Sequence, residues 1–502
     1  MLATRNRGLL MVGVMGAVVM VILDTTIANV ALPRMQTSLG ATPDSVTWVL
    51  TSYIIATAVA LPATGWLSGR LGSRNLFLLA VGGFIVASML CGTAVSLGEM
   101  VLFRILQGVA AAFISPLSQT TMIDITPPEG QAKAMSIWGM GVIVGPILGP
   151  VLGGFLTESY NWRWVFYVNL PVGMLTLAIL WFLLPSRPIE KRSFDFTGFV
   201  FVGLAIASFQ LMLDRGQNQD WFSSWEIVIE GCVALASAWV AVIYLATAKR
   251  PLFNPGMFAN RNLVLGMAFM VIVGLSTMAP MALLPSLLQQ LFGYPVVDTG
   301  VMMASRGIGV TVTMLISGQL MGKLDTRILI VTGFVVFGGS LRMMSFWSLE
   351  MDFWPVITSG FVQGLGMGLV FLPLNSLAFA TLPAQFRTDG ASLLNLMRSI
   401  GQSAGISMVT VLLARNIQVS HADLVQNVTE KTVPGINIGQ LDQLGSFSGA
   451  IFGMADAMIN RQAAMIAYLD NFYLMSWLCF AVVPFVLVLQ TAKGKVEVVH
   501  AE

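Results

Sequence analysis

The stretch GVIVGPILGPVLGG occupies residues Gly141–Gly154. Its glycines recur every four residues and would line one face of an α-helix: Gly141, Gly145, Gly149 and Gly153. A face without side chains lets a second helix approach closely, which is how helices associate in lipid. Pro146 and Pro150 would break a helix in water, but a membrane helix tolerates them because neighbouring groups satisfy the freed carbonyls. The stretch therefore predicts a bent and tightly packed membrane helix.

The composition of the whole chain agrees with a membrane protein. Of its 502 residues 56% are hydrophobic and only 10% are charged, whereas soluble domains carry roughly 25% charged residues. A net charge of +2 argues against a nucleic-acid partner. The three cysteines lie in apolar runs and the two histidines in polar segments, which leaves almost no material for a metal site or a histidine-based catalytic site.

Apolar runs long enough to cross a bilayer predict an all-α integral membrane protein with fourteen transmembrane helices. The first begins near Gly8 with flanks like those of a signal peptide, but it continues to Pro33 and is long enough to span, which predicts an uncleaved first helix. The others are expected near 45–68, 75–96, 98–122, 134–156, 165–185, 197–213, 226–247, 263–288, 298–321, 328–347, 354–380, 391–414 and 465–490. Lysines and arginines concentrate in alternate loops, which predicts that both termini are cytoplasmic.

An internal repeat divides the chain. GWLSGRLGSR at 65–74 aligns with GQLMGKLDTR at 318–327, and the Gln-Gly pairs at 107–108 and 363–364 each precede a proline by similar distances. This predicts an N-terminal six-helix bundle (1–185), a cytoplasmic linker with two extra transmembrane helices (186–250), and a C-terminal six-helix bundle (251–502). The polar stretch 416–461 is expected to be an external, periplasmic loop between the last two spans.

Several motifs in the right order resemble the fourteen-helix drug:proton antiporter branch of the major facilitator superfamily. They are LDTTIANVALP at 23–33, RILQG at 104–108, the glycine-proline stretch at 141–154, WRWVFYVNLP at 162–171, and LDRG with DWF at 213–216 and 220–222. The last pair resembles a subgroup of bacterial multidrug export pumps. The resemblance implies two bundles that rock against each other, with the glycine stripe facing the opposite half.

The loop at 65–74 also resembles a conformational motif of this superfamily, formed by Gly65, Gly69, Arg70 and Arg74. The superfamily usually has an acidic residue where this chain has Gly69. The departure places a charge relay centred on that acid in doubt, although both arginines remain.

Charged side chains inside apolar spans are candidates for function, because each costs at least about 2.5–3.5 kcal/mol at the bilayer centre. Asp24 and Arg104 are expected to couple transport to protons, and the alternative is an ion pair that only joins helices. The expected substrate path is lined by polar residues of other spans: Asn29, Gln107, Arg306, Asn375, Asn395 and Arg398.

The resemblance implies a proton-driven exporter of lipophilic small molecules that needs no cofactor and resides in a bacterial inner membrane. It also implies a periplasmic adaptor protein and an outer-membrane channel as partners, with 416–461 as the docking segment or, alternatively, a poorly ordered connector. A proton-independent nutrient importer and a multispanning membrane enzyme remain as alternatives.

Overall fold

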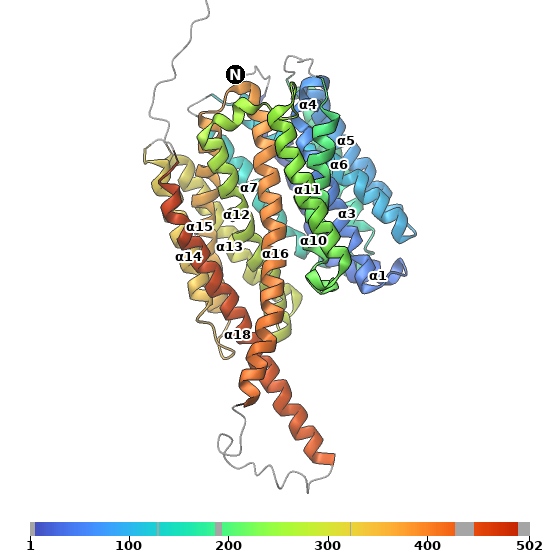
Figure 1. The fold of residues 1–502 in the computed structure, drawn as a ribbon, viewed down its shortest axis with the longest axis vertical. Helices are drawn as coiled ribbons and strands as arrows, with labels where there is room; N and C mark the ends of the chain where they lie inside the picture. Colours follow the sequence, from blue (N-terminus) through green and yellow to red (C-terminus); the bar gives the residue numbers. More distant parts are fainter. Residues whose placement is uncertain (1–5, 128–129, 186–192, 322, 427–445, 490–502) are drawn as a thin grey trace, which may run out of the picture.

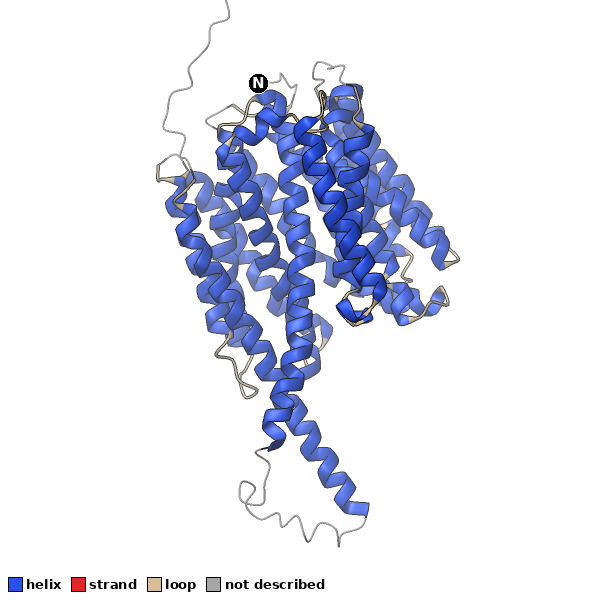
Figure 2. Ribbon diagram, in the orientation of Figure 1, coloured by secondary structure: helices blue, strands red, loops and turns tan. Residues whose placement is uncertain are grey.

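The computed structural model describes residues 6–127, 130–185, 193–321, 323–426 and 446–489. Helices make up almost all of this part of the chain, as Figure 2 shows, and no strand is formed within it beyond one isolated bridge between Met321 and Leu324. The predicted all-α fold class is confirmed.

The N-terminal bundle contains six membrane-crossing units, of which the second and sixth are interrupted helices. Their bounds are α1 (Arg7–Ser38), α3 (Trp48–Ala60) continued by η1 (Leu61–Ala63) and α4 (Thr64–Leu71), α5 (Ser73–Thr93), α6 (Leu97–Asp124), α7 (Gln131–Ser159), and α8 (Trp164–Tyr167) followed by α9 (Asn169–Leu183). A short helix, α2 (Pro43–Val46), joins α1 to α3.

The second bundle repeats this arrangement with longer final helices (Figure 1). Its members are α12 (Arg261–Ser286), which continues into the short π-helix η6 (Leu287–Leu291), α13 (Val296–Leu320), α14 (Thr326–Met344), α15 (Trp354–Ala380), α16 (Arg387–Gln426) and α18 (Ser446–Val486). Between the bundles lie α10 (Phe196–Arg215) and α11 (Trp225–Thr247), linked by the turns η3 (Gln217–Gln219) and η4 (Trp221–Ser223).

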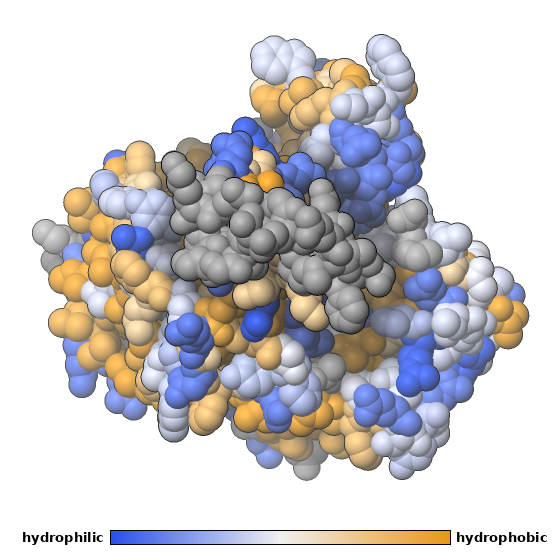
Figure 3. Space-filling view, turned by 90° about the horizontal axis from the view of Figure 1, so that it is seen from below, coloured by the Kyte–Doolittle hydropathy of each residue, from blue (hydrophilic) through white to orange (hydrophobic). Residues whose placement is uncertain are grey.

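Thirteen helices among the described residues are long and apolar enough to cross a membrane. The remaining predicted span, 134–156, coincides with α7, whose 29 residues extend about 43 Å. The end-on view in Figure 3 shows hydrophobic residues along parts of the rim of the molecule, with hydrophilic residues between them. The molecule is therefore a multi-pass membrane protein.

The two inserted helices cover the seam between the bundles on one side. Helix α10 packs against α3 of the first bundle and α16 of the second, while α11 packs on the outside of α10. Trp225, Leu235 and Trp239 of α11 remain 81%, 75% and 70% exposed, as expected for side chains that face lipid.

The prediction that residues 416–461 form a loop is wrong for both of its flanks. Helix α16 continues to Gln426 and α18 begins at Ser446, so the two helices project together beyond the rest of the bundle (Figure 1). The polar residues of these flanks are compatible with helix outside a membrane, where hydropathy no longer marks a helix. Residues 427–445 lie outside the described part, as does most of the predicted linker, 186–192.

The glycine stripe of α7 packs within its own bundle, which corrects the expectation that it faces the opposite half. A Cβ built on Gly145 would lie 2.5 Å from Ile22 Cγ2, and one on Gly149 would lie 2.0 Å from Thr26 Oγ1. Gly141 and Gly153 likewise lie against α1. A different residue of α7, Gly139, faces Met314 of α13 in the second bundle.

Candidate functional site

Asp24 and Arg104 form a fully buried ion pair inside the N-terminal bundle. Both side chains have no solvent-exposed surface, and Arg104 Nη1 lies 2.7 Å from Asp24 Oδ2. Asp24 lies in the middle of α1, whereas Arg104 lies two turns into α6. The sequence-predicted pair is therefore brought together by two helices that are 80 residues apart in the chain.

Two amide side chains complete the surroundings of the carboxylate. Gln107 Nε2 donates to Asp24 Oδ1 at 2.9 Å, and Asn169 Nδ2 donates to the same oxygen at 2.7 Å. Asn169 also donates to Ser88 Oγ at 2.9 Å. Hydrogen-bond donors therefore reach both oxygens of the Asp24 carboxylate.

Arg104 is oriented by contacts other than the ion pair. Its Nη1 also donates to Gln107 Oε1 at 2.7 Å, and its Nε donates to the backbone oxygen of Val49 at 3.2 Å. The guanidinium carbon lies 5.0 Å from the ring centroids of both Tyr53 and Phe166. Aromatic faces stabilise a desolvated cation. Arg104 Nη2 nevertheless has no hydrogen-bond partner among the described residues.

In this arrangement Asp24 is the counterion of the buried Arg104. Protonation of Asp24 would remove its charge and leave Arg104 buried without a counterion, a state that costs several kcal/mol unless the helices move. All of the hydrogen-bonding groups described here belong to the N-terminal bundle. A change in protonation would therefore act first on the packing of α1 against α6.

A second polar cluster joins the two bundles. Gln119 of α6 donates from Nε2 to Asn375 Oδ1 at 2.9 Å and accepts from Asn395 Nδ2 at 3.3 Å. Arg398 Nη2 in turn donates to Asn395 Oδ1 at 3.1 Å, and its guanidinium lies 5.6 Å from the ring of Phe371. We call Gln119, Asn375, Asn395 and Arg398 the inter-bundle cluster.

Further contacts between the bundles lie at the end of the molecule that carries Asn6. Arg387 Nη1 approaches Asp124 Oδ1 at 3.5 Å, and Ser392 Oγ donates to the backbone oxygen of Leu61. Helix α16 packs here against α4, η1 and α6. The bundles are thus held together at this end.

The remaining predicted residues are dispersed. Asn29 is exposed on α1, whereas Arg306 is buried within the C-terminal bundle and donates to the Thr277 backbone oxygen at 3.1 Å. Arg70 is exposed, and Arg74 donates to the Trp181 backbone oxygen at 2.6 Å. The side chains of Pro146 and Pro150 lie outside the described part, and Gly69 is partly buried at the end of α4.

Gln107, which the sequence predicts to line the substrate path, contacts both members of the buried ion pair. Asn169, Ser88 and Gln119 complete the two clusters, and sequence reasoning did not single them out. Asn169 lies inside the WRWVFYVNLP motif, so the motif itself carried a signal for it. Gln119 had no comparable signal.

A model of the Major Facilitator Superfamily matches residues 14–406. The chain belongs to this superfamily. It is therefore a secondary transporter and not an enzyme.

Relatives with assigned names cover most of the chain. The "Multidrug export protein EmrB" of Haemophilus influenzae is 36% identical over 416 residues, which cover 82% of this chain and 81% of that protein. EmrB of Escherichia coli K12 is 32% identical, covering 91% and 90%. The "Fatty acid resistance protein FarB" of Neisseria gonorrhoeae is 34% identical, covering 94% and 93%. The resemblance to multidrug export pumps is thereby confirmed.

Solved structures of superfamily members share the fold at low sequence identity. The proton:xylose symporter XylE superposes with a TM-score of 0.60 at 13% identity, covering 95% of each chain. The human organic anion transporter MFSD10 superposes with a TM-score of 0.57 at 14% identity, covering 95% of this chain and all of that one. These two comparisons support the major facilitator fold.

Proposed function

We propose that this protein is a proton-coupled exporter of lipophilic drugs or toxic compounds that works by alternating access. The observation that carries the proposal is the buried pair of Asp24 and Arg104, with its amide partners Gln107 and Asn169. The names of the EmrB and FarB relatives support the substrate class. The proton gradient would supply the energy, and no cofactor is required.

Coupling of drug export to proton movement would follow from competition between Arg104 and a proton for the Asp24 carboxylate. With the ion pair intact, α1 and α6 are held together; with Asp24 protonated, Arg104 needs another partner, and the helices shift to provide one. Substrate would act on the same equilibrium by binding between the bundles near the inter-bundle cluster. Proton and substrate then favour different arrangements of the same helices, which is the requirement for exchange.

The orientation proposed for the molecule places both termini in the cytoplasm of a bacterial inner membrane. The excess of lysine and arginine in loops on that side supports this orientation. The end where Arg387 meets Asp124 would then be cytoplasmic. Since the bundles are joined at that end, the structure would represent a state closed toward the cytoplasm.

The helices that project at the opposite end would then enter the periplasm. A periplasmic adaptor protein could dock on this pair, α16 and α18, and pass substrate to an outer-membrane channel. Their length supports a docking role, because 40 residues of helix extend about 60 Å, twice the roughly 30 Å of a hydrocarbon core.

Proteoliposomes with an imposed pH gradient test the proposed function. Addition of a lipophilic drug is expected to collapse the gradient, reported by dequenching of a pH-sensitive dye, and protein-free liposomes serve as the control. Drug movement that is independent of the gradient would favour a facilitator and contradict the proposal.

A further inference from the structure

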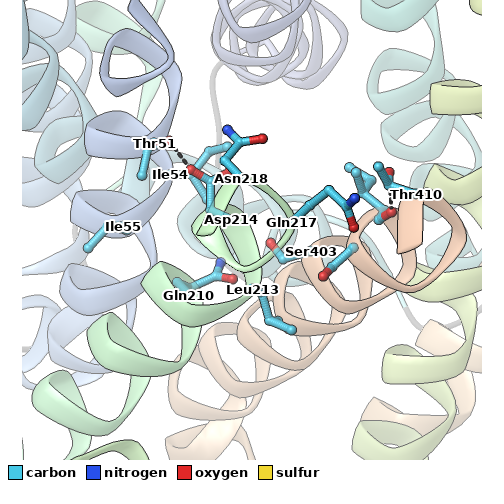
Figure 4. A pocket seen from close by; sticks show the side chains of 12 residues that line it. Thr51, Ile54, Ile55, Gln210, Leu213, Asp214, Gln217, Asn218, Ser403 and Thr410 are labelled. Carbon is cyan, nitrogen blue, oxygen red and sulfur yellow. Dashed lines mark hydrogen bonds between the residues drawn. The ribbon is translucent and has the colours of Figure 1, made fainter. Parts of the chain in front are cut away.

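A pocket lies beside the seam between the bundles, where the inserted helix α10 covers it. The pocket encloses about 190 Å³ and is lined by α3, by α10 with the turn that follows it, and by α16. Figure 4 shows Gln210 and Asp214 on α10, with Thr51 on one side and Ser403 and Thr410 on the other. We call this the α10 pocket. Its lining includes neither Asp24 and its hydrogen-bond partners nor any member of the inter-bundle cluster.

The α10 pocket contains buried polar groups that the protein leaves unsatisfied. Gln210 is only 2% exposed, yet neither its Nε2 nor its Oε1 has a hydrogen-bond partner among the described residues. Ser407 is 7% exposed, and its Oγ also has no partner there. An unsatisfied buried amide or hydroxyl costs about 1–3 kcal/mol, so a ligand that pairs with it gains affinity.

The charge at this end of α10 is negative. Arg215 is paired with two carboxylates, since its Nη2 lies 3.2 Å from Glu226 Oε2 and its Nη1 lies 3.5 Å from Glu230 Oε1. Asp214 accepts from the Thr51 hydroxyl, which carries no charge. Arg215 is thus occupied by Glu226 and Glu230, and Asp214 is the one charged residue among those that line the α10 pocket, so a cationic ligand is favoured.

The geometry points to a small amino alcohol in its ammonium form as the ligand of the α10 pocket; we propose this site as an addition to the drug path between the bundles. Gln210 and Asp214 are four residues apart, so they lie on the same face of α10 with Cβ atoms roughly 5–6 Å apart. The ammonium would donate to Asp214. The adjacent hydroxyl would accept from Gln210 Nε2 and donate to its Oε1.

Size and lining restrict the rest of the ligand. The pocket is smaller than the roughly 300–1,000 Å³ typical of sites for drug-sized molecules. Ile54, Leu213 and Ile406 provide apolar walls. A single aromatic or short alkyl group would pack against these walls, which makes phenylethanolamine a suitable probe.

Binding of phenylethanolamine to the purified full-length protein tests the proposal, with saturation-transfer NMR as the readout. No proton gradient is present, so a failure here is distinguishable from a failure of drug export. Phenethylamine, which lacks the hydroxyl, and styrene glycol, which lacks the charge, are each expected to bind at least about tenfold more weakly. Equal binding of styrene glycol would overturn the proposal.

Two variants test whether phenylethanolamine binds in the α10 pocket. Gln210→Leu and Asp214→Asn are each expected to raise Kd by at least about tenfold. Gln363→Leu is the matched control, because Gln363 is also a buried amide without a described partner but does not line this pocket. Asp214 is exposed, so Asp214→Asn is expected to fold and still tests the site if Gln210→Leu fails to fold. Unchanged affinity in Asp214→Asn, or an equal loss in Gln363→Leu, would refute the site.

Discussion

Gly65 of the N-terminal bundle lies directly against the carboxylate of Asp389 in the C-terminal bundle. A Cβ built on Gly65 would fall 1.4 Å from Asp389 Oδ1. The two residues belong to α4 and α16, at the end where the bundles are held together. Any side chain at position 65 must therefore displace Asp389 or separate the bundles.

We expect Gly65→Ala to weaken closure at this end. In a background that carries Gln119→Cys, that cysteine should then be alkylated several-fold faster with Gly65→Ala than without it, since the seam opens more often. Gly82→Ala is the control, because a Cβ there meets nothing within 4 Å. Equal alkylation rates in the two variants would show that Gly65 is not needed for closure.

Neutralising Asp24 should abolish drug-driven proton movement. Asp24→Asn keeps the shape but cannot titrate, and it leaves Arg104 buried without its counterion, so it should also destabilise the protein by up to about 3–5 kcal/mol. The double variant Asp24→Asn/Arg104→Gln removes both charges and should regain much of that stability without regaining transport. Thermal unfolding and dye dequenching in vesicles measure the two effects. Proton-coupled transport by the double variant would show that the Asp24–Arg104 pair has only a structural role.

Enlarging the glycine stripe should displace α1, which carries Asp24. Gly149→Leu would force a side chain into Thr26 and toward the Ile27 backbone nitrogen, 3.4 Å from a Cβ at that position. Overpacking of this kind costs about 1–3 kcal/mol, so we expect a lower unfolding temperature and reduced transport. Gly154→Leu is the control on the same helix, because a Cβ at Gly154 meets nothing within 4 Å. Matching behaviour of the two variants would exclude the stripe from positioning α1.

Removing Gln119 should loosen the inter-bundle cluster. Gln119→Leu deletes its hydrogen bonds to Asn375 and Asn395, at a cost of about 1–3 kcal/mol for groups left unsatisfied. We expect the equilibrium to shift toward separated bundles, measured by distances between spin labels on α6 and α16. Thr120→Val is the control, because the Thr120 hydroxyl donates to carbonyls of its own helix. A distance distribution identical to that of the control would contradict a closing role.

Replacing residues 416–461 by a Gly/Ser linker tests the proposed docking of an adaptor. Drug-driven proton movement in vesicles should persist, because the ion pair and the inter-bundle cluster are untouched. Co-purification of the adaptor should be lost, and with it resistance of intact cells. A variant that confers full resistance with the adaptor still bound would contradict docking at this segment.

The sequence predicted those features that follow from the cost of burying charge and backbone in lipid. Helical spans follow from apolar runs, and Asp24 and Arg104 stand out because charges are rare within those runs. The sequence did not predict which helix surfaces contact one another. A glycine face indicates that some helix approaches closely, but Gly145 and Gly149 carry no mark that distinguishes α1 from a helix of the other bundle.

Polar residues inside the spans present the same difficulty. Gln107 and Gln119 lie on one helix with similar apolar neighbours, yet one contacts the ion pair and the other joins the bundles. Only the tertiary arrangement separates these roles. The extension of α16 to Gln426 was not predicted for another reason. Hydropathy identifies a helix that lies in lipid, but it gives no signal for a helix that lies in water.

The continuity of α16 and α18 past the bundle has a mechanical consequence. An uninterrupted helix behaves as a rigid rod. If the C-terminal bundle tilts, the projecting tip would therefore move farther than the part of the helix inside the bundle. The helix continues from Ala414 to Gln426, which places that tip about 18 Å beyond the apolar part of α16. A protein bound at the tip would be displaced once in every transport cycle. Export could therefore change the conformation of that protein without any contact between it and the substrate.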